Sequence, residues 1–490
     1  MIVDLPLGEW LPDQPDQKNA LVKAEGVVAD AGCYRPIPSL LTVQATLPSG
    51  ICAGAFKTAR AAGDSVVCVG TSSDLFVIVG TTVTASGLAL SLGVNPIWVF
   101  ERFNRFVFAT AGGVTYYLPD IASSAVFLPL TGSPPQARAM GRVGDFLILG
   151  NLTLDIDASF SPYRIRWSGF NNPAGSWVDD IGTESGAVDM DATYGEVTAI
   201  AGGRYGLICQ QDAISRIFRS GTAASFSKEL IEEDRGCVAT ASVVRVGAFA
   251  FGLGRDGFWQ CNGATVQLIS SGRVWDWFLA NADTALIPKT QATVDYRSRC
   301  IIWNFFGQGS ASRNRQLIWA WDQNKWTAAS ITVDWAFARR IPGAVVDSAV
   351  EGAVLIDNSL DLVDAARFSE DKEQFAGFVG LNLLAANGPP IEAILETGEL
   401  QPVPGYRAMV RGVAPIMEGA ATGALLSVGV RTSSAGESVM YSPESSPGAQ
   451  GFAPQRKDGR YLRVAMRIPA GTLWSKASAL QVDFVQGGRG

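Results

Sequence analysis

Two short apolar runs, VVCVG at Val66–Gly70 and LFVIV at Leu75–Val79, form a pair that returns along this chain. Copies of the first run start 40, 40, 59, 43 and 52 positions apart, and a second strand-like run follows each of them. A repeat of about 40–50 residues built from strands and turns is typical of a β-propeller blade. The later copies of the first run are FVFAT at Phe106–Thr110, FLILG at Phe146–Gly150, YGLIC at Tyr205–Cys209, AFAFG at Ala248–Gly252 and CIIWN at Cys300–Asn304.

The repeat divides the chain into four parts and predicts an all-β fold. Residues 1–45 contain many Pro and Asp residues and are predicted to form an extended arm, which can supply the strand that joins the first blade to the last. Residues 46–345 are predicted to form a propeller of about six blades. Residues 346–390 are interpreted as a degenerate blade or a linker, with a short helix around Leu362–Phe368. Residues 391–490 show longer alternating strands, which predict a β-sandwich or barrel-like domain.

Two intervals of the repeat contain extra residues, Asn171–Asp191 and Gly307–Arg315. Neither adds an apolar run, so we predict that both are contact loops rather than core. GLGRDG at Gly252–Gly257 matches the glycine pattern of dinucleotide sites, but strand-like residues follow it where such a site needs a helix. We therefore predict a hairpin with Asp256 and Gly257 at its turn.

The composition excludes several kinds of chemistry. The chain has no histidine, which removes Ser-His-Asp and Cys-His sites and most transition-metal sites. It has seven cysteines, of which Cys68, Cys209 and Cys300 lie inside the repeated apolar runs, so we expect buried free thiols and synthesis in the cytosol. No secretory signal and no apolar run of membrane-spanning length is present, and no stable membrane insertion is expected. The pattern predicts no catalytic, cofactor-binding or metal-binding residue.

Charged and aromatic side chains leave other functions open. Acids cluster at Asp179-Asp180, at Glu232-Glu233-Asp234 and along Asp361, Asp364, Glu370, Asp371 and Glu373. Adjacent acids are usually a solvated loop face, but a propeller glycoside hydrolase or tail depolymerase with paired carboxylates is an alternative. A monomeric propeller that binds sugar or protein is another. Strand tryptophans, which could form a stacking platform, are predicted to be blade core; they include Trp303, Trp319 and Trp321.

Basic residues form no stripe in the sequence. The chain has 39 Lys and Arg against 46 Asp and Glu, a formal net charge of −7, which argues against tight binding of nucleic acid. The basic residues outside the repeats' apolar runs are scattered, as at Arg313 and Arg315, Arg339-Arg340, and Arg456-Lys457.

Several motifs, in this order, resemble the tail hub or nozzle proteins of short-tailed bacteriophages, the family that stabilises packaged DNA. An N-terminal element contains Gly32, Tyr34, Arg35 and Pro38. The other motifs are RIRWSGFNNPAGSW at Arg164–Trp177, DGFWQCNG at Asp256–Gly263, LIWAWDQNKWT from Leu317, GRYLRVAMRIPAG from Gly459 and LQVDFVQGG from Leu480.

This resemblance implies a structural virion protein rather than an enzyme. It implies a homo-hexameric ring below the connector, which extends the DNA channel, retains the packaged genome and conducts it at ejection. The implied partners are the head–tail adaptor or connector, tail fibre, spike or needle proteins, and double-stranded DNA in transit. Assembly would take place in the cytoplasm of the bacterial host, and no cofactor is implied.

Overall fold

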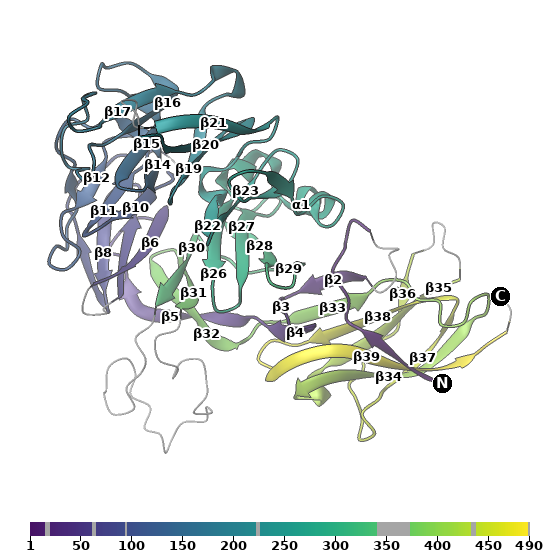
Figure 1. Ribbon diagram of the computed structural model, residues 1–490. Helices are drawn as coiled ribbons and strands as arrows, with labels where there is room; N and C mark the ends of the chain where they lie inside the picture. The colour runs from purple at the N-terminus through teal and green to yellow at the C-terminus, as the bar shows by residue number, and fades with distance from the viewer. Residues whose placement is uncertain are drawn as a thin grey trace.

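The chain folds almost entirely into β-strands, which form a propeller and a β-sandwich (Figure 1). A computed structural model describes residues 1–14, 20–60, 65–93, 96–221, 226–340, 373–432 and 438–488. The predicted all-β class is confirmed. The short helices of the described part include α1 (Trp275–Asn281) and the 3-10 turns at Thr240–Ser242 and Thr284–Lys289.

The propeller contains seven four-stranded antiparallel blades within the described residues. Blade 1 consists of β6 (Gly54–Ala59), β7 (Ser65–Gly70), β8 (Leu75–Val79) and β9 (Thr82–Ala85). Blade 2 consists of β10 (Val99–Phe103), β11 (Phe106–Thr110), β12 (Tyr116–Leu118) and β13 (Leu128–Pro129). Blade 3 consists of β14 (Gln136–Val143), β15 (Phe146–Leu154), β16 (Ser161–Trp167) and β17 (Gly186–Asp189). Blades 4 and 5 consist of β18 (Val197–Ala201), β19 (Gly206–Gln210), β20 (Ala213–Arg219) and β21 (Phe226–Glu233); and β22 (Val244–Val246), β23 (Phe249–Leu253), β24 (Phe258–Cys261) and β25 (Val266–Leu268). Blades 6 and 7 consist of β26 (Gln291–Asp295), β27 (Cys300–Phe306), β28 (Arg313–Ala320) and β29 (Lys325–Ala329); and β30 (Trp335–Arg340), β31 (Glu373–Val379), β32 (Asn382–Pro390) and β5 (Pro38–Thr46).

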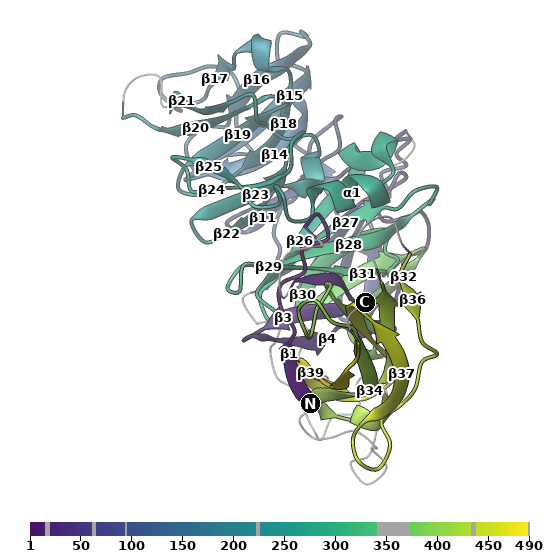
Figure 2. The same ribbon diagram turned by 90° about the vertical axis from the view of Figure 1, so that its right-hand side faces the viewer.

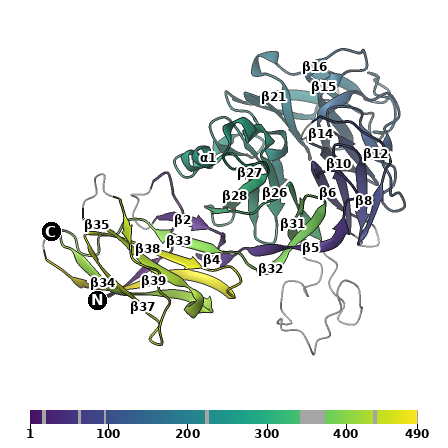
Figure 3. The same ribbon diagram turned by 180° about the vertical axis from the view of Figure 1, so that it is seen from behind.

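The blades form a closed ring, and Figure 3 shows the propeller from behind. The inner strands β6, β10, β14 and β18 contact one another in that order, and β18 contacts the 3-10 turn that leads into β22. β22 then contacts β26, β26 contacts β30, and β30 contacts β6. β5 closes the ring because it pairs with β32 as the outer strand of blade 7. A segment from the N-terminal region therefore joins the first blade to the last.

The repeated apolar runs of the sequence are the second strands of blades 1 to 6, and the runs that follow them are the third strands. The predicted hairpin is present, with Leu253 opposite Phe258. The blade count differs from the expected six because blade 7 obtains its second strand, β31, only after residues 341–372. Those residues lie outside the described ranges, and with them the helix expected at Leu362–Phe368.

The sandwich has two sheets. One contains β1 (Ile2–Pro6), β3 (Val27–Asp30), β4 (Cys33–Pro36), β34 (Ala408–Gly419), β37 (Ala453–Gly459) and β39 (Trp474–Gln486). The other contains β2 (Leu21–Glu25), β33 (Ala393–Thr397), β35 (Leu425–Arg431), β36 (Met440–Tyr441) and β38 (Tyr461–Ile468). Burial alternates strictly along β38, as expected for a strand with one face on a core.

Residues 1–45 are not a separate arm, because β1 to β4 are strands of the sandwich and only β5 joins the propeller. Trp10, Val27 and Tyr34 from this segment are buried in a core that also contains Leu395 and Val464. These strands are too short to show a clear alternation of apolar and polar residues, so their sequence looks irregular. Both chain termini lie at the sandwich (Figure 1).

One continuous sheet joins the two domains. Figure 2 shows β29 of the propeller beside the sandwich strand β3. β2 pairs in parallel with β29, the outer strand of blade 6, through Glu25 and Ala328. Glu25 also accepts hydrogen bonds from Arg315 Nη1 at 3.1 Å and Ser330 Oγ at 2.5 Å. The apolar core is likewise continuous from blades 5 and 6 into the sandwich. A shared sheet and a shared core predict that the domains unfold together.

Both inserts that were predicted to be contact loops contain core elements. Asn171–Asp191 includes β17, the fourth strand of blade 3, and Trp177, which is fully buried. Gly307–Arg315 includes the start of β28, where Arg313 is buried with its guanidinium over Phe306. The part of the prediction that placed these segments outside the core is wrong. β17 shows no apolar run, and only the polar start of β28 falls within the second insert.

The cysteines are free thiols, as predicted, and the burial of most of them predicts that they react slowly. All seven cysteines are unpaired; six are buried and Cys33 is half-buried. Burial raises the pKa of Cys68 to about 12 and the pKa of Cys209 and Cys300 well above the usual range. Because the thiolate is the reactive form, iodoacetamide should label only Cys33 in the native protein, as read by intact mass. A Cys33→Ser variant should stay unlabelled, and native labelling at several sites would contradict this.

A cavity at the centre of the propeller as the candidate functional site

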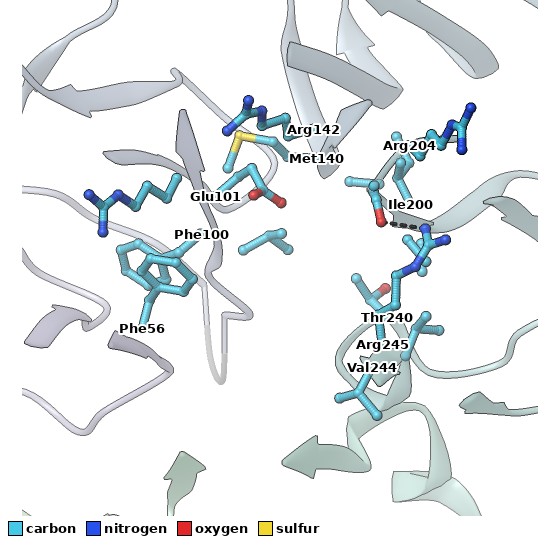
Figure 4. Close-up of a pocket in the computed structure, with 18 of the residues that line it drawn as sticks. Phe56, Phe100, Glu101, Met140, Arg142, Ile200, Arg204, Thr240, Val244 and Arg245 are labelled. Carbon is cyan, nitrogen blue, oxygen red and sulfur yellow. Dashed lines mark hydrogen bonds between the residues drawn. The ribbon is translucent and has the colours of Figure 1, made fainter. Parts of the chain in front are cut away.

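The inner strands of blades 1 to 5 surround a cavity of about 780 Å³ (Figure 4). This volume lies within the range of about 300–1,000 Å³ that is common for small-molecule sites. One wall holds Phe56 and Phe100, whose rings stack with centroids 6.3 Å apart. Met140, Ile200 and Val244 add apolar surface from the following blades. The cavity therefore lies among the inner strands of the ring and has a largely apolar wall with a few charged side chains.

Two glycines allow blades 3, 4 and 5 to approach one another beside the cavity. Gly203 N donates to Arg142 O at 2.7 Å, and Gly144 N donates to Gly203 O at 2.8 Å. A Cβ on Gly202 would lie 2.2 Å from Arg142 O, and one on Gly203 would lie 2.5 Å from Arg245 Nη1. Glycine is required at Gly202 because the near atom is backbone, and at Gly203 because its φ of +149° is strained for any other residue.

Glu101 is the one acid among the residues that line the cavity within the described ranges. Its carboxylate points into the open centre (Figure 4). Burial in the cavity raises its pKa to about 7, while hydrogen bonds from the backbone of Arg142 and Arg102 and the charge of Arg142 act in the opposite direction. Loss of solvation therefore dominates at this carboxyl group.

This shift predicts a pH-dependent stability that Glu101→Gln should remove. Because the folded chain holds the Glu101 proton more tightly, the wild type should lose stability as pH rises from 4.5 to about 7, with no further loss above that. The variant should melt at a higher temperature than the wild type at pH 8 and at the same temperature at pH 4, in calorimetry at both pH values. A lower melting temperature for the variant at pH 8 would show that the ionised carboxylate is stabilised.

Arginines from successive blades surround the same cavity. Arg102 Nη1 donates to Thr58 Oγ1 at 2.9 Å, and Arg142 lies over the Phe103 ring with its Cζ 4.9 Å from the centroid. Arg245 Nη1 donates to Gly202 O at 2.5 Å and to Tyr205 O at 3.1 Å. Each of these side chains reaches back to an earlier blade in the ring. They fasten neighbouring blades to one another around the cavity.

The acids that the sequence suggested as candidates do not form a catalytic pair in the described residues. Asp179 contacts Arg166, and Asp180 accepts from Gly182 N at 2.9 Å within its own turn. Glu232 pairs with Arg235, and Glu233 accepts from Tyr194 Oη at 3.1 Å. These acids hold loops and blade edges. Outside the described residues lie Asp361, Asp364, Glu370 and Asp371, and the Glu373 side chain also belongs there.

The other candidates are distributed over the fold. Trp303 and Trp319 are buried blade core, as predicted, and Trp321 is partly buried against the same core. Arg313 donates a hydrogen bond to Lys289 O, and Arg315 donates one to Glu25, so both side chains anchor blade 6 to neighbouring segments. Arg456 and Lys457 lie on β37 of the sandwich, far along the chain from the cavity. The side chains of Arg339 and Arg340 are outside the described residues.

The residues that line the cavity were missed at the level of sequence, although a signal was present. Arg102 and Arg142 each stand four residues before a repeated apolar run, and Arg245 stands three before. Alignment of the repeats would have shown arginine recurring at the end of the inner strand. Glu101 had no such signal, because its importance comes from the ring closing around it.

No group of three or more His, Cys, Asp or Glu side chains that could hold a metal ion is present in the described part of the chain. Within the same residues, no helix has the length and apolar character needed to cross a bilayer.

Comparisons with known proteins leave the family open. No protein-family model matches the chain, and no curated protein does. Among solved structures, apo AztD from Citrobacter koseri is similar at 12% identity over 54% of this chain and 70% of that chain, with a TM-score of 0.29. The extracellular domain of a putative hybrid two-component system from B. thetaiotaomicron is similar at 9% identity over 79% of this chain and 45% of that chain, with a TM-score of 0.38. Likenesses this distant carry no argument about function.

Proposed function

We propose that this chain is a structural protein of a short-tailed bacteriophage, a tail hub or nozzle that assembles into a ring, retains the packaged genome and conducts it at ejection. The observation that carries the proposal is the ordered set of family-like motifs. RIRWSG lies on and after β16, DGFWQC lies on and before β24, and LQVDFVQ lies on β39. The motifs therefore occupy strands of both domains, in chain order, rather than one local loop.

The architecture suits a rigid structural scaffold. The shared sheet between β29 and β2 and the shared core connect the propeller and the sandwich. Rigid connection between domains suits a ring subunit, which must keep its neighbours in a fixed geometry.

An exposed apolar hairpin tip offers a surface for assembly. The β15–β16 hairpin presents Leu154, Ile156 and Phe160, and Phe160 is 63% exposed. The buried carboxylate of Asp155 fixes the base of this tip through Arg164 and Arg166. Contiguous exposed apolar side chains on a rigid support are typical of protein–protein contact sites. We propose that a neighbouring subunit covers this hairpin in the ring.

The glycosidase alternative receives no support from the cavity. Hydrolysis of glycosides by the usual route needs two carboxyl groups about 5–10 Å apart across the substrate. Glu101 has no second acid beside it among the described residues of the cavity lining.

Electron microscopy of the purified protein, with its mass measured by light scattering, tests the proposal. Rings of about six copies are expected, and Phe160→Asp should yield folded monomers. Leu473→Asp is the matched control because Leu473 is 71% exposed in the sandwich, away from the hairpin. A wild type that stays monomeric at high concentration, or one that releases reducing ends from polysaccharide, would overturn the proposal.

A further inference from the structure

The arginines of the cavity rim, Arg102, Arg142, Arg204 and Arg245, differ from most other arginines of the described chain. Elsewhere, arginines typically lie within 4.0 Å of a carboxylate, as Arg164, Arg235 and Arg467 do. Among the rim arginines only Arg142 reaches one, Asp145, at the limit of 4.0 Å. The rim thus gathers four arginines against a single acid of the cavity lining, Glu101, on a chain whose net charge is −7.

The rim guanidinium groups are held in position by neutral partners. Arg102 Nε donates to Asn104 O at 3.0 Å, and Arg142 Nε donates to Gly144 O at 2.8 Å. Arg245 lies over the Tyr205 ring, with its Cζ 4.5 Å from the centroid. These contacts orient the groups, and within the described residues they leave N–H donors unused, including Nη2 of Arg102 and of Arg245. Oriented guanidinium groups with unused donors are what recognition of a phosphate requires.

Arg204 is the fourth rim arginine and lies in the turn that follows β18. Its side chain is exposed and makes no hydrogen bond or ion pair with the described residues. It extends away from the open centre in Figure 4, and an exposed side chain without partners changes rotamer within nanoseconds. Arg142, Arg204 and Arg245 come from three consecutive blades, so an anion over the opening could meet donors from several directions.

We propose that the rim arginines bind a phosphate group, either free or as the head of a small organic phosphate whose body enters the cavity. The volume of about 780 Å³ favours a small ligand over a macromolecule. The walls below the rim are apolar, with Phe56, Phe100 and Val244 among them, and would contact the organic part. This site does not depend on ring assembly or on the tail function.

Calorimetric titration of the full chain with inorganic phosphate, with AMP and with a short DNA duplex tests the site. Saturable binding of phosphate or AMP is expected, and tighter binding of AMP would show that the organic part is recognised. Arg204→Ala and Arg142→Gln should each weaken binding about tenfold, since each removes hydrogen bonds to a charged ligand. Arg456→Ala is the matched control, because it removes the same charge from the surface of the sandwich and should leave binding unchanged.

Arg204→Ala removes no hydrogen bond or ion pair within the described residues, so an unchanged melting temperature is expected and a loss of affinity cannot be assigned to unfolding. The proposal fails if neither phosphate nor AMP shows saturable binding, or if both rim variants bind like the wild type. It also fails if only the duplex binds, because the arginines would then contact a nucleic-acid backbone rather than a small ligand.

Discussion

Gly26→Ala should destabilise the whole molecule, because Gly26 is the corner at which β2 of one sheet passes into β3 of the other. Its N–H donates to Ala328 O of blade 6 at 2.8 Å, and its φ is +74°. A Cβ there would lie 2.0 Å from Glu392 O, which is backbone and cannot turn away. The left-handed conformation costs about 1–2 kcal/mol for alanine, and overpacking of this kind adds about 1–3 kcal/mol or more.

Urea denaturation followed by tryptophan fluorescence measures the effect, and Gly32→Ala is the matched control. Gly32 has a similar φ of +79° in the β3–β4 turn, but a Cβ there would meet nothing within 4 Å. The control should therefore lose only the conformational part, about 1–2 kcal/mol. Equal losses of unfolding free energy for the two variants would show that the backbone at Gly26 shifts to accommodate the added methyl group.

Arg166→Ala should cost about 3–5 kcal/mol of unfolding free energy, because it leaves a buried carboxylate with one fewer partner. Arg166 Nε donates to Asp155 Oδ1 at 2.9 Å, and Nη1 donates to Trp177 O at 3.2 Å. The Asp155 side chain has no exposed surface. Arg166 therefore fastens both the β15–β16 hairpin tip and the loop that contains Trp177 to blade 3.

The acid range supplies an independent readout of this network. Burial alone would raise the pKa of Asp155, but hydrogen bonds from Arg166 and then Arg164 outweigh it and lower the pKa below the usual value. Its stabilising contribution is thus complete above the pKa of the unfolded chain, near 3.8, and is lost as pH falls through the lower folded pKa. Melting curves from pH 7 to pH 2 should show a steep acid loss for the wild type and a shallower one for Arg166→Ala.

The double variant Asp155→Leu with Arg166→Met separates lost pairing from lost packing. Replacing both partners of a buried ion pair by apolar residues is often close to neutral, whereas removing one partner leaves a buried charge. The double variant should therefore be more stable than Arg166→Ala. If it is less stable, the two side chains act through their other contacts, with Arg164 and Asp179, more than through each other.

The strand order could be predicted wherever a blade repeats the same apolar run. Val66–Gly70 and Cys300–Asn304 are typical, since a second strand buried on both sides must be apolar along its whole length. Blade 7 and the fourth strand of blade 3 were missed for the opposite reason. β31 of blade 7 is separated from the repeat by residues 341–372, and β17 of blade 3 carries few apolar side chains.

The amino-acid sequence by itself determined the all-β class, the repeat, the buried thiols and the absence of histidine chemistry. These properties depend on residue type and on local spacing. Tertiary structure alone decided that β1 to β4 complete the sandwich, that one sheet joins the domains, and that Glu101 faces arginines from several blades. Those arrangements need contacts between residues far apart in the chain, such as Glu25 with Ala328 and Gly203 with Arg142. Such contacts arise only when ring closure brings the strands together, and no local pattern records them.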